Sequence, residues 1–210
     1  MKERLINLFG ENNLEKIKNA HILLVGIGGV GSFCFETLIR CGVENITVID
    51  FDTYEESNLN RQLYATIDTL GKKKIDTALA RAKSINENVN INVLDTFLDF
   101  NSDFDFSSYD YIIDACDSVP AKANLILNAK KYNKKIIVSL GIGNRVCPEL
   151  VCKSTLKENL SDPLGKKLNH YLIKKCDFNE NVNVICSKEK PIKSQPISSY
   201  VCTTSVAGIY

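Results

Sequence analysis

The chain has 210 residues, 44% of them hydrophobic, and a formal net charge of +1 at pH 7. This length favours one domain with a sizeable core over two full domains. The longest apolar run, residues 22–31, is too short and too rich in glycine to cross a bilayer, and no apolar leader follows Met1, so we expect a cytoplasmic protein.

Apolar segments and helical patterns alternate along most of the chain, after one or two short amphipathic helices within residues 2–20. Five runs rich in Ile and Val predict buried parallel strands at residues 21–26, 45–50, 90–96, 109–116 and 135–141. Apolar residues at helical spacing predict helices at residues 32–42, 71–86 and 120–133. This alternation predicts an α/β fold with a Rossmann-like, doubly wound, mostly parallel sheet.

The sequence VGIGGVGS lies between the first predicted strand and the first predicted helix after it. Gly26, Gly28 and Gly31 fit G-x-G-x-x-G, and Gly29 lies inside the motif. The helix that follows presents unpaired N–H groups and the positive end of its dipole, which favour an anion. The turn therefore predicts a phosphate-binding site, the phosphate seat, which would suit NAD and ATP equally.

Asp50 ends the second predicted strand, 19 positions after Gly31. An acidic residue at this place can accept hydrogen bonds from ribose hydroxyls. Both nucleotides have such a ribose, so Asp50 does not separate NAD from ATP.

The segment after Asp50 favours ATP. Its polar and charged residues include five that we count as candidate site residues: Asp52, Asn58, Arg61, Gln62 and Lys74. A dinucleotide's pyrophosphate is held by backbone N–H groups, whereas attack at the α-phosphorus of ATP develops charge that cationic side chains stabilise. We therefore expect ATP, with Arg61 and Lys74 as candidate catalytic cations and Asp52, Asn58 and Gln62 near the nucleotide.

The sequence DACDS lies at the carboxyl end of the fourth predicted strand. Asp114 ends that strand and Asp117 lies just beyond it, at the sheet edge where ligands of such folds bind. Carboxylates suit Mg²⁺, so we expect Mg²⁺ at this edge, with Asp117 as its ligand and Asp114 as a second carboxylate suited to it.

The pattern changes after residue 143, where an irregular extension, residues 144–210, completes a single domain. Within it we expect a helix at 162–176 and a strand at 181–187. Residues 1–120 hold 11 Lys and Arg against 19 Asp and Glu, whereas residues 121–210 hold 15 against 6. A basic half can neutralise nucleic-acid phosphates, although a solvated lysine-rich surface has the same composition.

Four of these sequences, GIGGVGS, DFDTYEESNLNRQ, GKKK and DACDS, together resemble the ATP-binding core of the ubiquitin-activating-type adenylating enzymes, the ThiF/MoeB/HesA superfamily. The resemblance covers residues 1–143. It implies that Asp50 binds the ribose, that Asn58, Arg61 and Lys74 contact the phosphates, and that Asp117 serves Mg²⁺. It also implies a homodimer in which Arg4 enters the partner's catalytic site.

Two motifs in the extension resemble the tRNA threonylcarbamoyladenosine dehydratases of this superfamily: D-P-L-x-x-x-L at residues 162–168 and S-K-E-x-P at residues 187–191. The resemblance implies that a tRNA is the substrate and that its threonylcarbamoyladenosine is cyclised, with loss of water, through an acyl adenylate. Gly165 and Cys147 depart from the pattern, which has Ala and Asp there. Relatives continue past Tyr210 into a helix, so we expect the extension to lack a final helix.

Two other functions stay open. MoeB-like and ThiF-like members adenylate the C-terminus of a ubiquitin-like sulfur-carrier protein and usually carry two C-x-x-C zinc pairs. The eight cysteines here form no such pair, so we expect no zinc. Because no apolar leader follows Met1 and several cysteines lie within apolar runs, we also expect them to be reduced. The other function is a nucleotide-binding scaffold without catalysis. A sulfur-transfer protein also stays open as a partner.

Overall fold

A single seven-stranded sheet forms the centre of the computed structural model, which describes residues 2–194 and 196–210. Its strand order is β3-β2-β1-β4-β5-β7-β6. The strands are β1 (His21–Val25), β2 (Asn45–Ile49), β3 (Asn90–Leu94), β4 (Tyr111–Asp114), β5 (Lys135–Ser139), β6 (Val151–Thr155) and β7 (Asn183–Ser187). Neighbouring strands are parallel except β6 and β7. The predicted fold class is confirmed.

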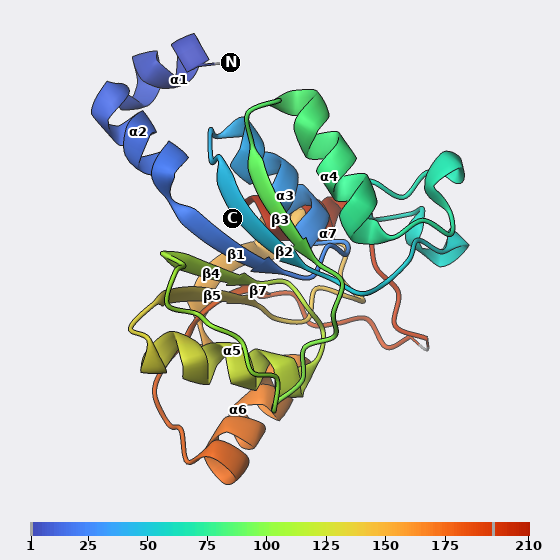
Figure 1. Cartoon of the computed structure of the whole chain (residues 1–210). Helices are drawn as coiled ribbons and strands as arrows, with labels where there is room; N and C mark the ends of the chain where they lie inside the picture. Colours follow the sequence, from blue (N-terminus) through green and yellow to red (C-terminus); the bar gives the residue numbers. More distant parts are fainter. Residues whose placement is uncertain (1, 195) are drawn as a thin grey trace.

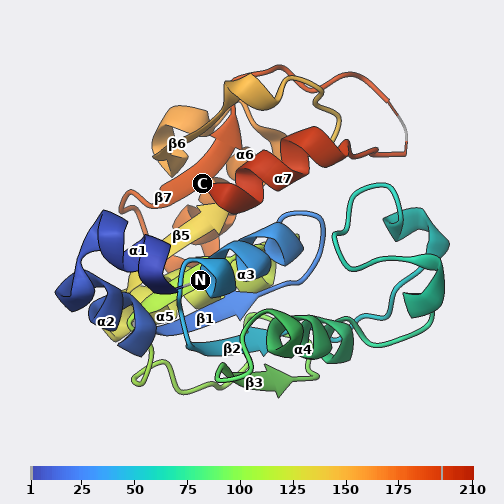
Figure 2. The ribbon, with the colours of Figure 1, turned by 90° about the horizontal axis from the view of Figure 1, so that it is seen from above.

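Helices cover both faces of this sheet (Figure 1). They are α1 (Lys2–Phe9), α2 (Glu11–Asn19), α3 (Gly31–Arg40), α4 (Lys74–Ile85), α5 (Val119–Lys131), α6 (Pro163–Cys176) and α7 (Val201–Ile209). Helices α3, α4 and α7 lie on one face, and α5 and α6 lie on the other. Figure 2 shows α7 beside α3, with which it packs, and α1 with α2 at one end of the sheet.

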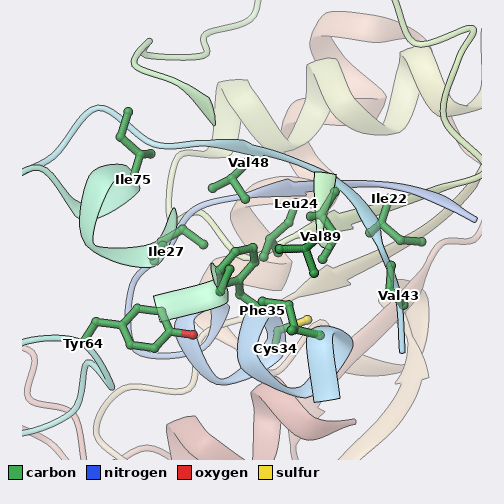
Figure 3. Close-up of a cluster of buried hydrophobic side chains, with 14 of the residues drawn as sticks. Ile22, Leu24, Ile27, Cys34, Phe35, Val43, Val48, Tyr64, Ile75 and Val89 are labelled. Carbon is green, nitrogen blue, oxygen red and sulfur yellow. The ribbon is translucent and has the colours of Figure 1, made fainter. Parts of the chain in front are cut away.

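The core lies on both faces of the central strands because successive strand residues point in opposite directions. On the α3 face, Leu24 packs with Phe35 in a buried cluster (Figure 3). On the opposite face, Leu23 packs with Ile112 and Leu125 of α5. The continuous apolar runs of the predicted strands reflect this burial on both sides.

Local signals fix where the helices α5 and α6 begin. Ser118 accepts a hydrogen bond from the Ala121 N–H at the start of α5, and Asp162 accepts one from the Gly165 N–H at the start of α6. A proline stands in the first turn of each helix, where its missing N–H leaves no hydrogen bond unmade.

The extension continues the sheet. The predicted helix at 162–176 and strand at 181–187 correspond to α6 and β7, and β7 pairs with β5. The sequence patterns did not predict β6 or α7, and α7 is a helix near the end of the extension. The expectation that the extension lacks a final helix that its relatives have stays a prediction. No helix within the described residues is long and apolar enough to cross a membrane.

Candidate active site at the glycine turn

The glycine turn has the geometry that the motif predicts. Gly26 has a φ of 93°, and a Cβ there would lie 2.8 Å from the Ala115 carbonyl oxygen. A Cβ on Gly31 would lie 1.8 Å from the Gly26 carbonyl oxygen, so only glycine lets α3 begin this close to β1. Around Gly28, by contrast, no described atom lies within 4 Å of such a Cβ, which leaves the turn open to a ligand.

Asp50 is bound directly to this turn. One carboxylate oxygen accepts the Ile27 N–H at 2.7 Å, and the other accepts the Asp52 N–H at 2.9 Å. Burial raises the pKa of Asp50, while these two N–H bonds and the charge of Lys74 oppose the rise. The sheet edge thus holds a carboxylate beside the glycine turn, where a ribose can reach it.

Lys74 and Asp52 form an ion pair next to Asp50. The Lys74 Nζ lies 2.7 Å from an Asp52 oxygen; the Lys74 side chain is buried, whereas that of Asp52 is 46% exposed. A backbone bond from the Lys74 N–H to the Asp52 carbonyl fixes the start of α4 at the same place. Asp52 therefore positions the predicted cation at the edge of the site.

Asn58 organises the segment that carries the other candidates. Its side-chain oxygen accepts the Glu55 N–H, and its carbonyl oxygen accepts the Gln62 N–H. The Leu63 N–H donates to the Ser32 hydroxyl at 3.1 Å, which ties this segment to the glycine turn. Gln62 is buried, and its amide oxygen has no hydrogen-bond partner among the described residues.

Arg61 lies against the glycine turn, because its Cγ is 3.4 Å from where a Gly29 Cβ would be. Its guanidinium donates to the Ser57 carbonyl at 2.6 Å and to the Asn60 side chain at 2.9 Å. Arg61 is thus near the predicted phosphate seat, with its side chain held by its own segment.

Asp114 does not serve as the predicted second carboxylate for Mg²⁺. It is fully buried and forms an ion pair with Lys122, whose Nζ lies 3.1 Å from both its oxygens and 2.8 Å from the Ser139 carbonyl oxygen. The Cys116 N–H and thiol also donate to Asp114. The expectation for Asp114 is therefore wrong, because a protein cation already neutralises it. Asp117 is exposed beyond β4.

Arg4 is remote from the glycine turn of its own subunit. It is exposed on α1, and the neighbouring Leu5 approaches Gly42, which follows the C-terminal end of α3. The glycine turn lies at the other end of α3, about 15 Å away for a helix of 10 residues. The structure brings the other candidates together at one sheet edge but leaves Arg4 at the opposite end.

The extension is held by a buried arginine that sequence patterns did not predict. Arg145 donates to Asp162 at 2.6 Å, to the Glu189 carbonyl at 3.2 Å and to the Gly141 carbonyl. It therefore joins the loop after β5 to the start of α6 and to the loop after β7. Arg145 and Asp162 are both almost fully buried, so each neutralises the other's charge.

Both extension motifs converge on this loop. Asp162, from D-P-L-x-x-x-L, caps α6 and pairs with Arg145. Glu189, from S-K-E-x-P, accepts the N–H groups of Val146 and Cys147 at 2.9 and 2.8 Å. Residues 141–147 follow β5 at the carboxyl edge of the sheet, the same edge as the glycine turn. The motifs thus shape one loop beside the candidate site.

The two departures from the motif pattern have different physical settings. A Cβ on Gly165 would lie 2.9 Å from the Asn159 carbonyl oxygen and 3.1 Å from Leu140, so glycine suits this packing better than alanine. Cys147 is half-buried, and burial followed by the nearby carboxylates of Glu189 and Glu149 raises the pKa of its thiol. Cys147 therefore has no activated-thiolate character.

An apolar cavity of about 320 Å³ lies between α3, α7 and the sheet. It is lined by residues such as Leu38, Ile113, Ile137, Ala207 and Tyr210. Asp114 also lines it, but the glycines of the turn, Asp50, Arg61 and Lys74 do not. The nucleotide seat is therefore assigned from the turn and its charged neighbours rather than from this cavity.

Comparison with known proteins identifies the family to which this fold and candidate site belong. The ThiF family model matches residues 2–188. The chain belongs to the ThiF family. The tRNA threonylcarbamoyladenosine dehydratase of Haemophilus influenzae is 35% identical over 192 residues, which cover 90% of this chain and 74% of that relative. The molybdopterin-synthase adenylyltransferase of Escherichia coli is 29% identical over 149 residues, 69% of this chain and 58% of that relative.

Solved structures agree with this ThiF-family placement. The Escherichia coli tRNA N6-threonylcarbamoyladenosine dehydratase, TcdA, in complex with AMP aligns with a TM-score of 0.93 and 31% identity, over 98% of this chain and 88% of that one. The same enzyme in complex with ATP aligns with a TM-score of 0.91 and 30% identity. The likeness includes the extension as well as the core.

Lys122 and Arg145 are the site-supporting residues that sequence reasoning missed. The sequence contains a local signal for Lys122, which lies in an apolar stretch of α5, between two alanines and just before Leu125 and Ile126. A lysine in such a stretch indicates a buried cation. Arg145 had no such signal, since its partners lie 17 and 44 positions away.

Proposed function

We propose that this chain is an ATP-dependent tRNA threonylcarbamoyladenosine dehydratase. The observation that carries the proposal is the extent of the likeness to TcdA, which includes the extension and both of its motifs. The adenylyltransferase that serves molybdopterin synthase matches a shorter part of the chain. Both dehydratase-like motifs of the extension contact the loop of residues 141–147, and this loop follows β5 at the same sheet edge as the glycine turn. The motifs that distinguish the dehydratases therefore shape a loop that borders the candidate site.

ATP fits the side chains at the sheet edge. The open Gly28 and the first N–H groups of α3 suit phosphates, and the carboxylate of Asp50 suits ribose hydroxyls. Arg61 and Lys74 supply positive charge for the non-bridging oxygens and the departing pyrophosphate. Asp52 holds Lys74 through their ion pair, the Asn58 carbonyl accepts the Arg61 N–H, and we place Gln62 near the nucleotide.

Mg²⁺ and a second subunit complete the proposal. Within the described residues no group of three or more metal-ligating side chains occurs, but Mg²⁺ in nucleotide sites commonly uses one or two carboxylates with substrate phosphates. Asp117 is the carboxylate that we assign to it. In a homodimer, Arg4 would reach the partner's site. We place the enzyme in the cytoplasm with its tRNA, and the proposal includes no sulfur-transfer protein.

The chemistry follows from the poor reactivity of a carboxylate. The threonyl carboxylate attacks the α-phosphorus of ATP, pyrophosphate departs, and an acyl adenylate forms. The carbamoyl group of the same side chain then attacks the acyl carbon and AMP departs, so one water is lost overall. Because both reacting groups belong to one nucleotide, proximity favours ring closure and no protein nucleophile is needed.

Mass spectrometry of tRNA nucleosides tests this function. With ATP, the purified protein should convert threonylcarbamoyladenosine in tRNA to a product that has lost one water, and should release pyrophosphate and AMP; without ATP it should not. The gene's deletion should remove the cyclic nucleoside from cellular tRNA.

Two results would contradict this function and identify another one. Pyrophosphate exchange that requires a Gly-Gly-ended carrier protein and ignores tRNA would identify a carrier-protein adenylyltransferase. ATP binding without release of pyrophosphate on either substrate would identify a nucleotide-binding scaffold.

A further inference from the structure

The outer face of α6 carries lysines without acidic partners. Four of its lysines are exposed, and within residues 2–194 and 196–210 none forms an ion pair or a side-chain hydrogen bond: Lys166, Lys167, Lys174 and Lys175. Some lysines elsewhere do have an acidic partner, as in the Lys73–Asp95 and Lys130–Glu180 pairs. The charge of α6 is therefore available to an anionic partner.

A groove of about 280 Å³ lies on the same face of α6. It is lined by Leu160, Lys166, Asn169, His170, Ile173 and Lys174. Residues three and four positions apart share one helix face, so Lys166, Asn169 and Ile173 line it together. Leu160 and Ile173 are 41% and 39% exposed, which gives the groove an apolar surface among polar and cationic groups.

A groove with an apolar surface, polar side chains and nearby lysines fits a nucleobase that has a phosphate on either side. A base has a flat apolar face for Ile173 and hydrogen-bonding edges for Asn169 and His170, while the phosphates on either side attract lysines. Lys166 and Lys174 are eight positions apart, about 12 Å along the helix, so they suit separate phosphates of one strand.

The position of α6 connects this groove to the active site. The capping Asp162 fixes the first turn of α6 to Arg145, in the loop beside the glycine turn. A strand whose modified nucleotide enters that site can therefore continue onto α6.

We propose that the outer face of α6 binds the tRNA strand adjoining the modified nucleotide, with phosphates at Lys166 and Lys174 and one unstacked base in the groove. This inference rests on the proposed function, because it requires that tRNA is the substrate. It specifies which surface recognises the tRNA.

Binding of an anticodon stem-loop RNA that carries threonylcarbamoyladenosine, measured over a range of salt concentrations, tests the surface. Lys166→Ala with Lys174→Ala should weaken binding about tenfold and lower the slope of log K against log salt by about 1.4 to 1.8, because two phosphate contacts are lost. Lys16→Ala with Lys153→Ala removes equal charge from exposed sites on α2 and β6 and should change neither quantity.

A second variant separates the groove from the charge. Asn169→Phe fills the groove without changing net charge, and should weaken binding about threefold to tenfold with the wild-type salt slope. The KM for ATP should stay at the wild-type value in every variant.

The outcomes distinguish this inference from the proposed function. If the wild-type protein dehydrates the RNA and the lysine variant binds it with wild-type affinity and slope, the α6 surface is wrong and the function stands. If the wild-type protein neither binds nor converts the RNA, both are wrong. An equal loss in the Lys16 and Lys153 control would also overturn the surface, because general charge would then explain binding.

Discussion

Residues 1–143 and residues 144–210 differ in charge and in how they relate to known proteins. The first part holds 16 Lys and Arg against 19 Asp and Glu, and the second holds 10 against 6. The first part contains the glycine turn and its charged neighbours, which adenylating enzymes with different substrates also need. The second contains the loop contacts and the α6 surface that follow from the dehydratase-like motifs.

Each part nevertheless contains one buried ion pair at the carboxyl edge of the sheet. In the core, Asp114 and Lys122 join the ends of β4 and β5 to α5. In the extension, Arg145 and Asp162 join the loop after β5 to α6. We infer that the first pair supports the nucleotide seat and the second supports substrate recognition, so changes in the two parts should have separable effects.

The largest expected effect tests whether the core is complete in one subunit. In the proposed homodimer, the Arg4→Ala and Lys74→Ala variants should each be nearly inactive, because each would lack a cation that we propose neutralises the phosphates as pyrophosphate departs. A mixture should recover roughly a quarter of wild-type activity per site, because about half of randomly exchanged dimers are mixed and each has one intact site. Pyrophosphate release measures it. No recovery after demonstrated subunit exchange would place Arg4 outside the partner's site.

Substitutions that break the two buried ion pairs test directly whether residues 1–143 and 144–210 have separate roles. Lys122→Met and Arg145→Met each leave a buried carboxylate without its cation, so each should lower the free energy of unfolding by about 3 to 5 kcal/mol. Urea titration measures this. At a temperature where both variants are folded, Lys122→Met should weaken ATP binding and Arg145→Met should raise the KM for tRNA. Equal loss of ATP affinity in both variants would contradict the division between the two parts.

Two substitutions within the core should separate binding from chemistry. Arg61→Ala should mainly lower kcat, by an amount corresponding to about 2 to 4 kcal/mol, because it removes charge stabilisation of the transition state. Asp50→Ala should mainly raise the KM for ATP, because it would remove the ribose contacts that we propose for this carboxylate. Steady-state kinetics with saturating tRNA measures both. Wild-type turnover in the Arg61→Ala variant would show that Arg61 is not a catalytic residue.

The smallest expected effect concerns the packing of α3 against α4 in the core. Hydrogen bonds and charge from Arg81 and Arg40 lower the pKa of Glu36. An acid with a lowered folded-state pKa adds stability above its ordinary pKa, here 4.5, and loses it as the pH falls through the folded value. Glu36→Gln should therefore cost on the order of 1 kcal/mol at pH 7.

Unfolding titrations between neutral and acidic pH check this last effect. The difference between wild type and Glu36→Gln should shrink as the pH falls below 4.5. A difference that stays constant with pH would show that shape rather than charge is responsible.

Local periodicity was enough to predict the core. The five parallel strands, their connecting helices, the glycine turn and Asp50 all follow from neighbours in the chain. The central strand β1 is buried on both faces and reads as a continuous apolar run, whereas the partly exposed edge strand β3 alternates polar and apolar residues. The proximity of Asp50 to the turn also follows, since the carboxyl ends of adjacent parallel strands share one edge. The same reasoning placed Asp114 at this edge but did not reveal that Lys122 neutralises it.

Tertiary packing decided the parts whose local patterns are weak. The segment VCTTSVAGI has many β-branched residues, yet it forms α7, which packs on α3, where a Cβ on Gly208 would lie 2.3 Å from the Val30 carbonyl. The edge strand β6 has an exposed side and no long apolar run. Arg145 contacts Asp162 and Glu189, which lie 17 and 44 positions away, and the strand β7 before Glu189 pairs with β5 rather than with a neighbour in the chain. These features depend on contacts between residues far apart in the chain, which local periodicity does not encode.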